Sequence, residues 1–292
     1  MPSIHSQVVF ITGGAHGIGE QLARRLHAKG ASVVVTDLDK TALTKLADDL
    51  GERVLTAVAD VRDLSAMESV TEQAVQRFGG IDTVVANAGI ASYGSVLNVD
   101  PETFKRVIDV DVLGVFNTVR AALPSVIERR GYVLVVSSLA AFTPLAGMAS
   151  YDVAKAGVEH FASALRQEVA PQGVEVGSAH MSWIDTPLVR DTKTDLGAFG
   201  EMLTKLPWPL NKTTSVEKCV DAFVAGIEGR RRRVYCPRWV GLFRWLKPVL
   251  TLRAVEGPFI KGAATIVPRM DAEVAALGRS TSAYNEAIEK EK

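Results

Sequence analysis

Residues 7–30 constrain the fold of this chain more than any other stretch. An apolar run at 7–12 has the composition of a buried strand, and a glycine-rich loop at 13–19 and a helical pattern at 20–29 follow it. The glycines allow a tight turn and a close approach to a pyrophosphate, which the free N–H groups at a helix start can bind. The same glycine spacing also fits an ordinary turn between a strand and a helix, so the rest of the chain has to decide between the two interpretations.

The alternation of strand and helix continues through most of the chain. Further strands are predicted at residues 32–36, 53–59, 83–86, 133–136 and 174–179. A helix at 102–129 is expected to break near Pro124, and one at 151–170 is expected to begin behind an N-cap at Ser150. Repeated units of this length predict an α/β fold: a Rossmann-type doubly wound parallel sheet of about seven strands, with helices on both faces and a helical C-terminal extension.

Composition favours one globular domain and excludes several classes of protein. The 292 residues are 47% hydrophobic and carry a net charge of zero, so the core is large and nothing points to nucleic acid. Cys219 and Cys236 have neither CxxC nor metal-site spacing, which predicts no metal site and a reducing, cytoplasmic location. We also expect no signal peptide and no apolar segment long enough to span a bilayer.

Asp37 bears on the choice of cofactor. It ends the strand at 32–36, about where an acidic residue grips the adenosine ribose hydroxyls in dinucleotide-binding folds. A carboxylate there repels a 2′-phosphate, so NAD is favoured over NADP. His16, in the glycine loop, would soften that preference because a basic residue helps to bind a phosphate.

Three groups that can handle a proton converge at one edge of the predicted sheet. Ser138 follows the strand at 133–136, and Tyr151 and Lys155 are four residues apart on the next helix, so they share one face. The lysine ammonium should lower the tyrosine pKa, and such a phenol can exchange a proton with an alcohol or ketone. A bare Tyr-x-x-x-Lys often arises by chance, with the tyrosine merely packed and the lysine in solvent, and only the other motifs decide against that interpretation.

The order and spacing of these motifs resemble the short-chain dehydrogenase/reductase family over roughly residues 5–237. The matching segments are Thr12–Gly19, Asp60-Val61, Asn87-Ala88-Gly89, Ser138, Tyr151–Lys155 and Trp183–Pro187. The resemblance implies that Tyr151 is the catalytic acid/base, that Ser138 binds and orients the substrate oxygen beside it, and that Lys155 binds the nicotinamide ribose. The cofactor-binding residues that it implies are Gly13, His16, Gly17, Ile18, Gly19, Asp37, Leu38, Asp60, Val61, Asn87, Gly89, Tyr151, Lys155, Ile184 and Thr186.

Two positions depart from the family pattern. Asp111 replaces the asparagine that usually completes a proton relay. An aspartate keeps the main chain and nearly the same size, so we count Asp111 among the catalytic residues and expect a working relay with altered pH behaviour. The alternative is a neutral exchange without consequence. Met181-Ser182 replaces the family's Pro-Gly, which would shape the backbone over the nicotinamide differently.

The second half of the chain predicts a substrate lid and an extension. Residues 1–237 form the expected catalytic domain, with a lid at 188–212 whose apolar residues favour a small hydrophobic alcohol or ketone. The same residues would equally pack on the core or on a partner subunit. Residues 238–292 form a basic, amphipathic helical extension, with a terminal helix at 270–292 that frays at its last three residues.

The extension is also a candidate interaction surface. Residues 230–261 carry nine Lys or Arg against one acid, Glu256, and hold an apolar stripe at helical spacing made of Trp239, Leu242, Phe243, Leu246 and Leu250. Such a helix can give peripheral membrane contact through 238–261, cap the substrate cleft, or pack on another subunit. Contact with protein is favoured over contact with a membrane. Family resemblance also suggests a homodimer or homotetramer through the helices at 102–129 and 151–170.

These features predict an NAD(P)-dependent oxidoreductase that interconverts an alcohol and a ketone or aldehyde. The alternative is a cofactor-sensing or scaffold protein of the same fold with weak chemistry, for which Asp111 would be the first sign. Either protein could sit at a membrane surface through its extension.

Overall fold

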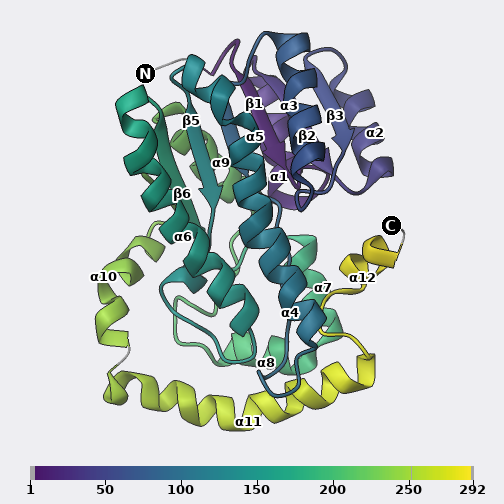
Figure 1. Ribbon diagram of the computed structural model, residues 1–292. Coiled ribbons are helices and arrows are strands. Elements are labelled where there is room, and N and C mark those ends of the chain that lie inside the picture. Colours follow the sequence, from purple (N-terminus) through teal and green to yellow (C-terminus); the bar gives the residue numbers. More distant parts are fainter. Residues whose placement is uncertain (1–3, 251, 291–292) are drawn as a thin grey trace.

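Seven parallel strands form one sheet in the order β3-β2-β1-β4-β5-β6-β7 in the computed structural model, which describes residues 4–250 and 252–290 (Figure 1). The strands are β1 (Val8–Thr12), β2 (Ser32–Asp37), β3 (Val54–Val58), β4 (Thr83–Ala86), β5 (Tyr132–Val136), β6 (Glu175–Met181) and β7 (Arg233–Cys236). The central strands β1, β4 and β5 are buried along their whole length because helices cover both faces, as their continuous apolar runs predict. The prediction of a doubly wound parallel sheet is confirmed.

The helices divide between the two faces. The first face carries α1 (Gly17–Ala28), α2 (Lys40–Leu50) and α9 (Val216–Glu228), whose buried side chains join one apolar core. The second face carries α3 (Leu64–Phe78), α5 (Gly114–Glu128) and α6 (Ala149–Val169), which build the other core. The remaining elements near the strand ends are α4 (Pro101–Ile108), the π-helical turn η1 (Asp109–Leu113), the short turns η2 (Leu139–Ala141) and η3 (Ala170–Gln172), α7 (Pro187–Asp195) and α8 (Gly197–Lys205).

Two predicted helix features are wrong. The break falls at the π-helical turn 109–113 and not at Pro124, which lies inside α5. Ser150 is not an N-cap: α6 begins at Ala149, and the buried Ser150 hydroxyl lies 2.5 Å from that of Ser92. The Ser150 hydroxyl is committed to a neighbouring loop and does not cap the helix.

The extension consists of α10 (Val240–Leu250), α11 (Arg253–Leu277) and α12 (Ala283–Lys290). The single terminal helix predicted at 270–292 is wrong, because α11 ends at Gly278, which takes the left-handed conformation with φ 64°. Figure 1 shows α11 running past α8 and α12 returning toward the strand ends. Of the residues expected to fray, 291–292 lie outside the described residues.

One helical stretch, Pro101–Glu128, is long and apolar enough to cross a membrane by length and composition. The expectation that the chain holds no such segment is therefore wrong. Half of its most apolar window is buried inside the protein, where α5 packs against the sheet. The core helix of a soluble protein passes the same test, so this stretch is weak evidence for a membrane span.

Candidate active site

The carboxyl end of β5 and the first turns of α6 bring the three predicted catalytic side chains together. Ser138 directly follows β5, and its Oγ accepts the Ala140 N–H at 3.2 Å. Tyr151 and Lys155 lie one turn apart on α6, with Lys155 Nζ 5.3 Å from the centre of the tyrosine ring. The Ser138 hydroxyl is hydrogen-bonded to Tyr151. The sheet edge therefore holds a hydroxyl, a phenol and an ammonium in one cluster.

Lys155 is held by a buried carboxylate. Its Nζ lies 2.9 Å from Asp111 Oδ2 and donates to the Val136 carbonyl at 3.3 Å. The other oxygen, Asp111 Oδ1, accepts the Ile90 N–H at 2.7 Å. Asp111 is fully buried, so both of its oxygens are committed to neighbours in the site.

The π-helical turn η1 aims Asp111 at this cluster. The Gly114 N–H donates to the carbonyl of Asp109, five residues back, which widens the helix by one residue; such turns often lie at functional sites. Gly89 leaves the space, because a Cβ atom there would lie 2.9 Å from Asp111 Oδ2 and 3.1 Å from Lys155 Nζ. The π-helical turn and Gly89 thus bring the Asp111 carboxyl group against Lys155.

The expected lowering of the Tyr151 pKa is wrong for this structure. Burial raises the pKa of Tyr151 by more than the Lys155 ammonium and the Ser138 hydroxyl lower it, and the Asp111 charge adds to the rise. Burial alone would lower the pKa of Lys155, but Asp111 and Tyr151 outweigh it and the pKa is raised, so the lysine stays an ammonium. Burial likewise raises the pKa of Asp111 against the pull of Lys155. The sequence showed the nearby charge but not the depth of burial.

The glycine loop fits a dinucleotide pyrophosphate. Gly13 and Gly17 have positive φ values of 62° and 56°. A Cβ atom on Gly19 would lie 2.2 Å from the Gly13 carbonyl, so only glycine fits there. Helix α1 begins at Gly17, after which Ile18 packs on the first core, and its N-cap residue His16 makes no side-chain cap hydrogen bond. The first N–H groups of α1 therefore keep no capping side chain, as an anion site requires.

Asn87 fastens this loop to the sheet. Its Nδ2 donates to the carbonyls of Thr12 and Gly13, both at 3.0 Å, and its backbone N–H reaches Thr12 Oγ1 at 3.2 Å. These contacts link the end of β4 to the end of β1. They place Asn87 in the support of the loop.

Asp37 stands at the end of β2 in a fixed orientation. Its Oδ2 accepts the Ala15 N–H at 3.0 Å, and its Oδ1 accepts the Leu38 N–H at 2.8 Å. His16, proposed from the sequence as a partner for a phosphate, instead has its Nε2 2.9 Å from Asp39 Oδ2. The structure thus places a carboxylate beside the one basic residue of the glycine loop.

The loop after β3 lies next to these residues. Asp60 holds Arg62, with Arg62 Nη2 2.8 Å from Asp60 Oδ2. The Val61 carbonyl accepts from Asn117 Nδ2 at 3.0 Å, and the Val61 side chain packs so tightly on Gly114 that a Cβ atom there would lie 2.5 Å away. The predicted adenine-side residues therefore adjoin the helix that begins at Gly114.

Ile184 and Thr186 join the glycine loop from the other side. Ile184 is buried and bridges to Thr214, and the Thr186 N–H donates to the Ile184 carbonyl at 2.7 Å. A Cβ atom on Gly17 would lie 3.5 Å from the Thr186 methyl group, so the two predicted cofactor segments adjoin each other. In place of the family's Pro-Gly, strand β6 ends at Met181, and the Ser182 N–H donates to the Cys236 carbonyl at 2.9 Å.

Two buried titratable groups escaped the sequence analysis. Asp152 accepts the Leu145 N–H at 2.9 Å, and burial raises its pKa to about 7. His180 Nδ1 lies 3.2 Å from the Ser138 carbonyl, its ring stacks on Phe142 at 4.5 Å, and burial lowers its pKa to about 3. The position of Asp152 next to Tyr151 was a usable signal. His180 gave none, because a lone histidine in a strand does not reveal what lies behind it.

An apolar cluster lies on the substrate side of Tyr151. It combines residues of the predicted lid, of the loops after β4 and β5, and of α11. Its members include Ala91, Tyr93, Met148, Leu196, Phe199, Met202, Leu203, Ile266, Met270 and Val274, with Tyr151 and Trp183 packed against it. The lid thus packs on the extension, and Tyr151 packs against this apolar cluster.

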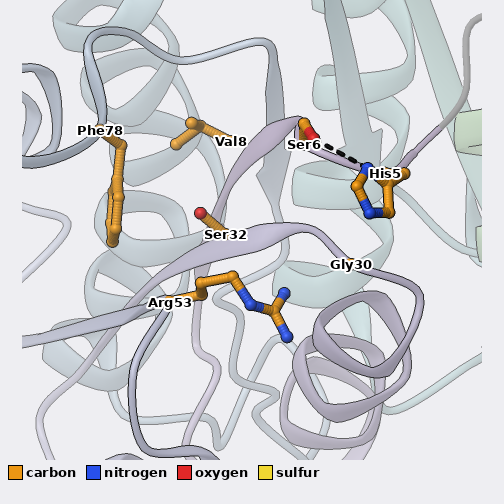
Figure 2. Close-up of a pocket in the computed structure, with 7 residues that line it drawn as sticks. All are labelled: His5, Ser6, Val8, Gly30, Ser32, Arg53 and Phe78. Carbon is orange, nitrogen blue, oxygen red and sulfur yellow. Dashed lines mark hydrogen bonds between the residues drawn. The ribbon is translucent and has the colours of Figure 1, made fainter.

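A cavity of about 390 Å³ lies elsewhere in the protein. Figure 2 shows its lining residues His5, Ser6, Val8, Gly30, Ser32, Arg53 and Phe78. They lie where strands β1, β2 and β3 begin, whereas the catalytic candidates lie where strands end. Arg53 is already bonded to two carbonyls there, those of Ala31 and His27. This cavity is separate from the candidate site.

Comparison with known proteins agrees with this geometry. The profile of the short chain dehydrogenase family matches residues 7–197. An uncharacterized oxidoreductase of Mycobacterium tuberculosis is 31% identical, over 78% of this chain and 92% of the relative. A cis-2,3-dihydrobiphenyl-2,3-diol dehydrogenase of Paraburkholderia xenovorans is 34% identical, over 76% and 83%, and a (-)-trans-carveol dehydrogenase of Rhodococcus erythropolis is 34% identical, over 66% and 76%.

Solved structures give the same result. The 3-ketoacyl-(acyl-carrier-protein) reductase of Brucella melitensis, complexed with NADH, is 27% identical over 80% of this chain and 97% of its own, with a TM-score of 0.71. A short chain dehydrogenase of Mycobacterium paratuberculosis, bound to NAD, is 26% identical over 80% and 97%, with a TM-score of 0.69. The chain is an oxidoreductase that belongs to the short-chain dehydrogenase/reductase family.

Proposed function

We propose that this protein interconverts a hydrophobic, cyclic alcohol and its ketone with NAD as the hydride carrier and Tyr151 as the acid/base. The observation that carries the proposal is the cluster of Ser138, Tyr151 and Lys155 at the carboxyl end of β5, facing an apolar surface. The nicotinamide supplies the hydride chemistry when it is bound. The protein has to hold the substrate oxygen and move one proton.

Each side chain has a defined task in this proposal. In oxidation, the Tyr151 phenolate takes the hydroxyl proton of the alcohol, and in reduction the phenol returns it to the ketone oxygen. Ser138 donates a hydrogen bond to the same oxygen and keeps it against Tyr151. Lys155 stays an ammonium, favours the phenolate and has a fixed position through Asp111 and the Val136 carbonyl.

The substrate class rests on the apolar cluster and on the relatives. Tyr93 and Phe199 meet edge to face at 5.4 Å, and Trp183 meets Phe199 at 5.6 Å, which gives the substrate side aromatic walls. Two relatives are named for cyclic, largely hydrocarbon alcohols, a carveol and a dihydrobiphenyl diol. A monocyclic or bicyclic secondary alcohol is the substrate that fits these walls best.

Asp37 and Asp39 favour NAD over NADP. Asp37 accepts three backbone N–H bonds, from Ala15, Leu38 and Asp39, and keeps its carboxylate at the end of β2, where the adenosine ribose is expected. Asp39 is paired with His16, the residue that would otherwise help to bind a 2′-phosphate. Both solved relatives described above hold NADH or NAD, in agreement with this choice.

The second candidate is a cofactor sensor with weak chemistry, and the Asp111 carboxylate beside Lys155 is the observation in its favour. Its charge opposes formation of the Tyr151 phenolate. Purified protein mixed with NAD or NADP and a panel of cyclic alcohols, with nicotinamide absorbance as the readout, separates the two functions. Turnover of a cyclic alcohol with NAD supports the enzyme, and cofactor binding without turnover of any panel member favours the sensor.

We also propose a homodimer or homotetramer that works in the cytoplasm. The stretches expected to form the contact, residues 102–129 and 151–170, leave Leu113, Phe116 and Val153 exposed. Phe116 meets Phe161 at 6.4 Å on the same surface. An exposed apolar surface of this kind is typical of a subunit interface. Light scattering of the purified chain tests it, and a monomer at micromolar concentration would contradict it.

A further inference from the structure

The last helix of the chain, α12, lies across the cofactor half of the sheet edge (Figure 1). Two ion pairs set its path: Arg106 Nη2 is 2.8 Å from Glu286 Oε1, and Arg62 Nη2 is 3.1 Å from Glu289 Oε1. Arg62 belongs to the loop after β3, where the adenine is expected. The C-terminal helix is thus anchored beside the proposed adenosine site.

The segment before α12 is a buried anchor. The Tyr93 N–H donates to the Ser280 carbonyl at 2.8 Å, and Thr281 Oγ1 donates to the Ala91 carbonyl at 2.9 Å. Ser280, Thr281 and Ser282 are all buried. The position of α12 therefore follows from contacts with the loop after β4.

Tyr284, in the first turn of α12, lies against the glycine loop. Its ring meets the His16 ring edge to face, with centroids 5.3 Å apart. Burial, followed by the charges of Asp37 and Asp39 and by a hydrogen bond with Asp39, raises the pKa of Tyr284, so the hydroxyl keeps its proton and lies beside both carboxylates. Asp37 is the residue expected to hold the ribose hydroxyls, which places Tyr284 at the adenosine ribose.

The charges around Tyr284 disfavour a phosphate. His16 is paired with Asp39, whose other oxygen also accepts a backbone N–H in the first turn of α2 at 2.9 Å. Arg62 has carboxylates on both sides, from Asp60 and from Glu289. Both cations and the start of α2 are thus occupied by carboxylates of this chain.

We propose that α12 forms the outer wall of the adenosine site, where Tyr284 and the neighbouring carboxylates hold an unphosphorylated ribose and exclude a 2′-phosphate. This inference rests on the proposed function, since it assumes a nicotinamide dinucleotide at the glycine loop. It assigns cofactor specificity partly to a segment outside the family match, which ends at residue 197.

The test compares the full chain with a chain that ends at Ser282, which keeps the buried anchor and removes α12. Fluorescence titration should show the Kd for NADH rising about tenfold, as expected for the loss of one aromatic contact and its hydrogen bond. The Kd for NADPH should change much less, so the preference of the protein for NADH over NADPH becomes smaller. The shortened chain should lose as much affinity for ADP-ribose as for NADH, because α12 contacts only the adenosine half of the dinucleotide.

Point variants keep the inference testable if the shortened chain unfolds. Tyr284→Ala should reproduce most of the loss for NADH, whereas Tyr284→Phe keeps the ring on His16 and should lose less. Ala287→Ser, at an exposed position of the same helix, is the matched control and should bind like the full chain. Unchanged NADH affinity in both the shortened chain and Tyr284→Ala overturns the inference, and so does tighter binding, which would make α12 an obstruction. If the full chain itself does not bind NADH, the proposed function fails instead.

Discussion

Lys155 and Asp111 form a buried ion pair, with Nζ 2.9 Å from Oδ2 and almost no exposure of either side chain. Asp111 contacts Lys155, and Lys155 in turn lies against Tyr151, the residue proposed to carry the proton. A buried pair of this kind adds little to stability by itself, because desolvation offsets the attraction. Its effect on the site is electrostatic: the negative charge stabilises the ammonium and raises the Tyr151 pKa.

In Asp111→Asn, the rise of alcohol oxidation with pH, which follows formation of the Tyr151 phenolate, should shift toward lower pH. Removal of the carboxylate charge removes one cause of the raised Tyr151 pKa, so the phenolate forms at lower pH. The measurement is kcat/KM for oxidation against pH in the two proteins. Superimposable profiles would show that Asp111 has no electrostatic influence on the tyrosine.

Asp111→Leu separates charge from packing. The amide of Asp111→Asn keeps one acceptor oxygen, which can serve the Ile90 N–H, whereas its NH2 group cannot accept from Lys155, so this variant should lose only part of the stability that a leucine variant loses. Leucine leaves the Ile90 N–H buried without a side-chain acceptor and Lys155 with the Val136 carbonyl alone, which should cost roughly 3–5 kcal/mol of unfolding free energy. Urea unfolding compares the two variants, and equal midpoints would contradict this account of the site.

Tyr151→Phe should abolish most turnover and leave cofactor binding intact. The substitution removes the proposed proton carrier but keeps the ring in the apolar cluster. Turnover should fall by at least ~10²–10⁴-fold, the range for loss of a general acid/base. The kcat and the NADH affinity are measured side by side, and preserved turnover would overturn the catalytic assignment.

Asp37→Ala should narrow the gap between NAD and NADP by at least about tenfold, since a like-charge contact with the 2′-phosphate costs several kcal/mol. Most of the change should come from better NADP binding. Asp37→Asn separates the charge from the hydrogen bond, because it loses the negative charge but keeps an oxygen that can accept the Ala15 N–H. If wild-type protein binds NADP as tightly as NAD, the role given to Asp37 is wrong.

Asp152→Asn should stabilise the protein above pH 7 and have little effect near pH 4. Burial raises the Asp152 pKa from 3.8 to about 7, so the folded protein holds the proton more tightly and loses stability as the pH rises between these values. An asparagine stays neutral and keeps an acceptor for the Leu145 N–H. The expected gain is on the order of 4 kcal/mol at pH 8, and thermal unfolding at both pH values tests it. If the Tm difference between Asp152→Asn and the unmodified protein were the same at both pH values, ionisation of Asp152 would not be its cause.

Contact of the extension with a membrane, the less favoured of its predicted contacts, would make the full chain bind vesicles that contain anionic phospholipid and not neutral ones. Trp245 is 73% exposed on α10, close to exposed Leu242 and Val249, and Arg244 lies over its ring at 4.9 Å. A basic helix with an exposed tryptophan fits an anionic membrane surface.

Trp245→Ala should weaken co-flotation with anionic vesicles. Val58→Ala, at an exposed position of the edge strand β3, is the control and should float like the unmodified chain. Equal recovery of the full chain and a chain cut after Pro237 would remove the proposal of membrane contact.

The amino-acid sequence by itself determined the doubly wound sheet and the residues of the candidate site. The apolar runs at β1, β4 and β5 can be satisfied only by burial on both faces, and strand order then brings Ser138, Tyr151 and the glycine loop to one edge. These are local patterns repeated along the chain, so each could be interpreted on its own.

Tertiary structure alone decided the sign of the Tyr151 pKa shift and the place of the C-terminal helix. The pKa depends on how much solvent the surrounding chain removes, and that burial outweighs the charge of Lys155. The path of α12 depends on partners far away in the sequence: Arg62, Arg106 and His16. Burial and long-range pairing are properties of the assembled fold, and neither periodicity nor spacing in the sequence encodes them directly.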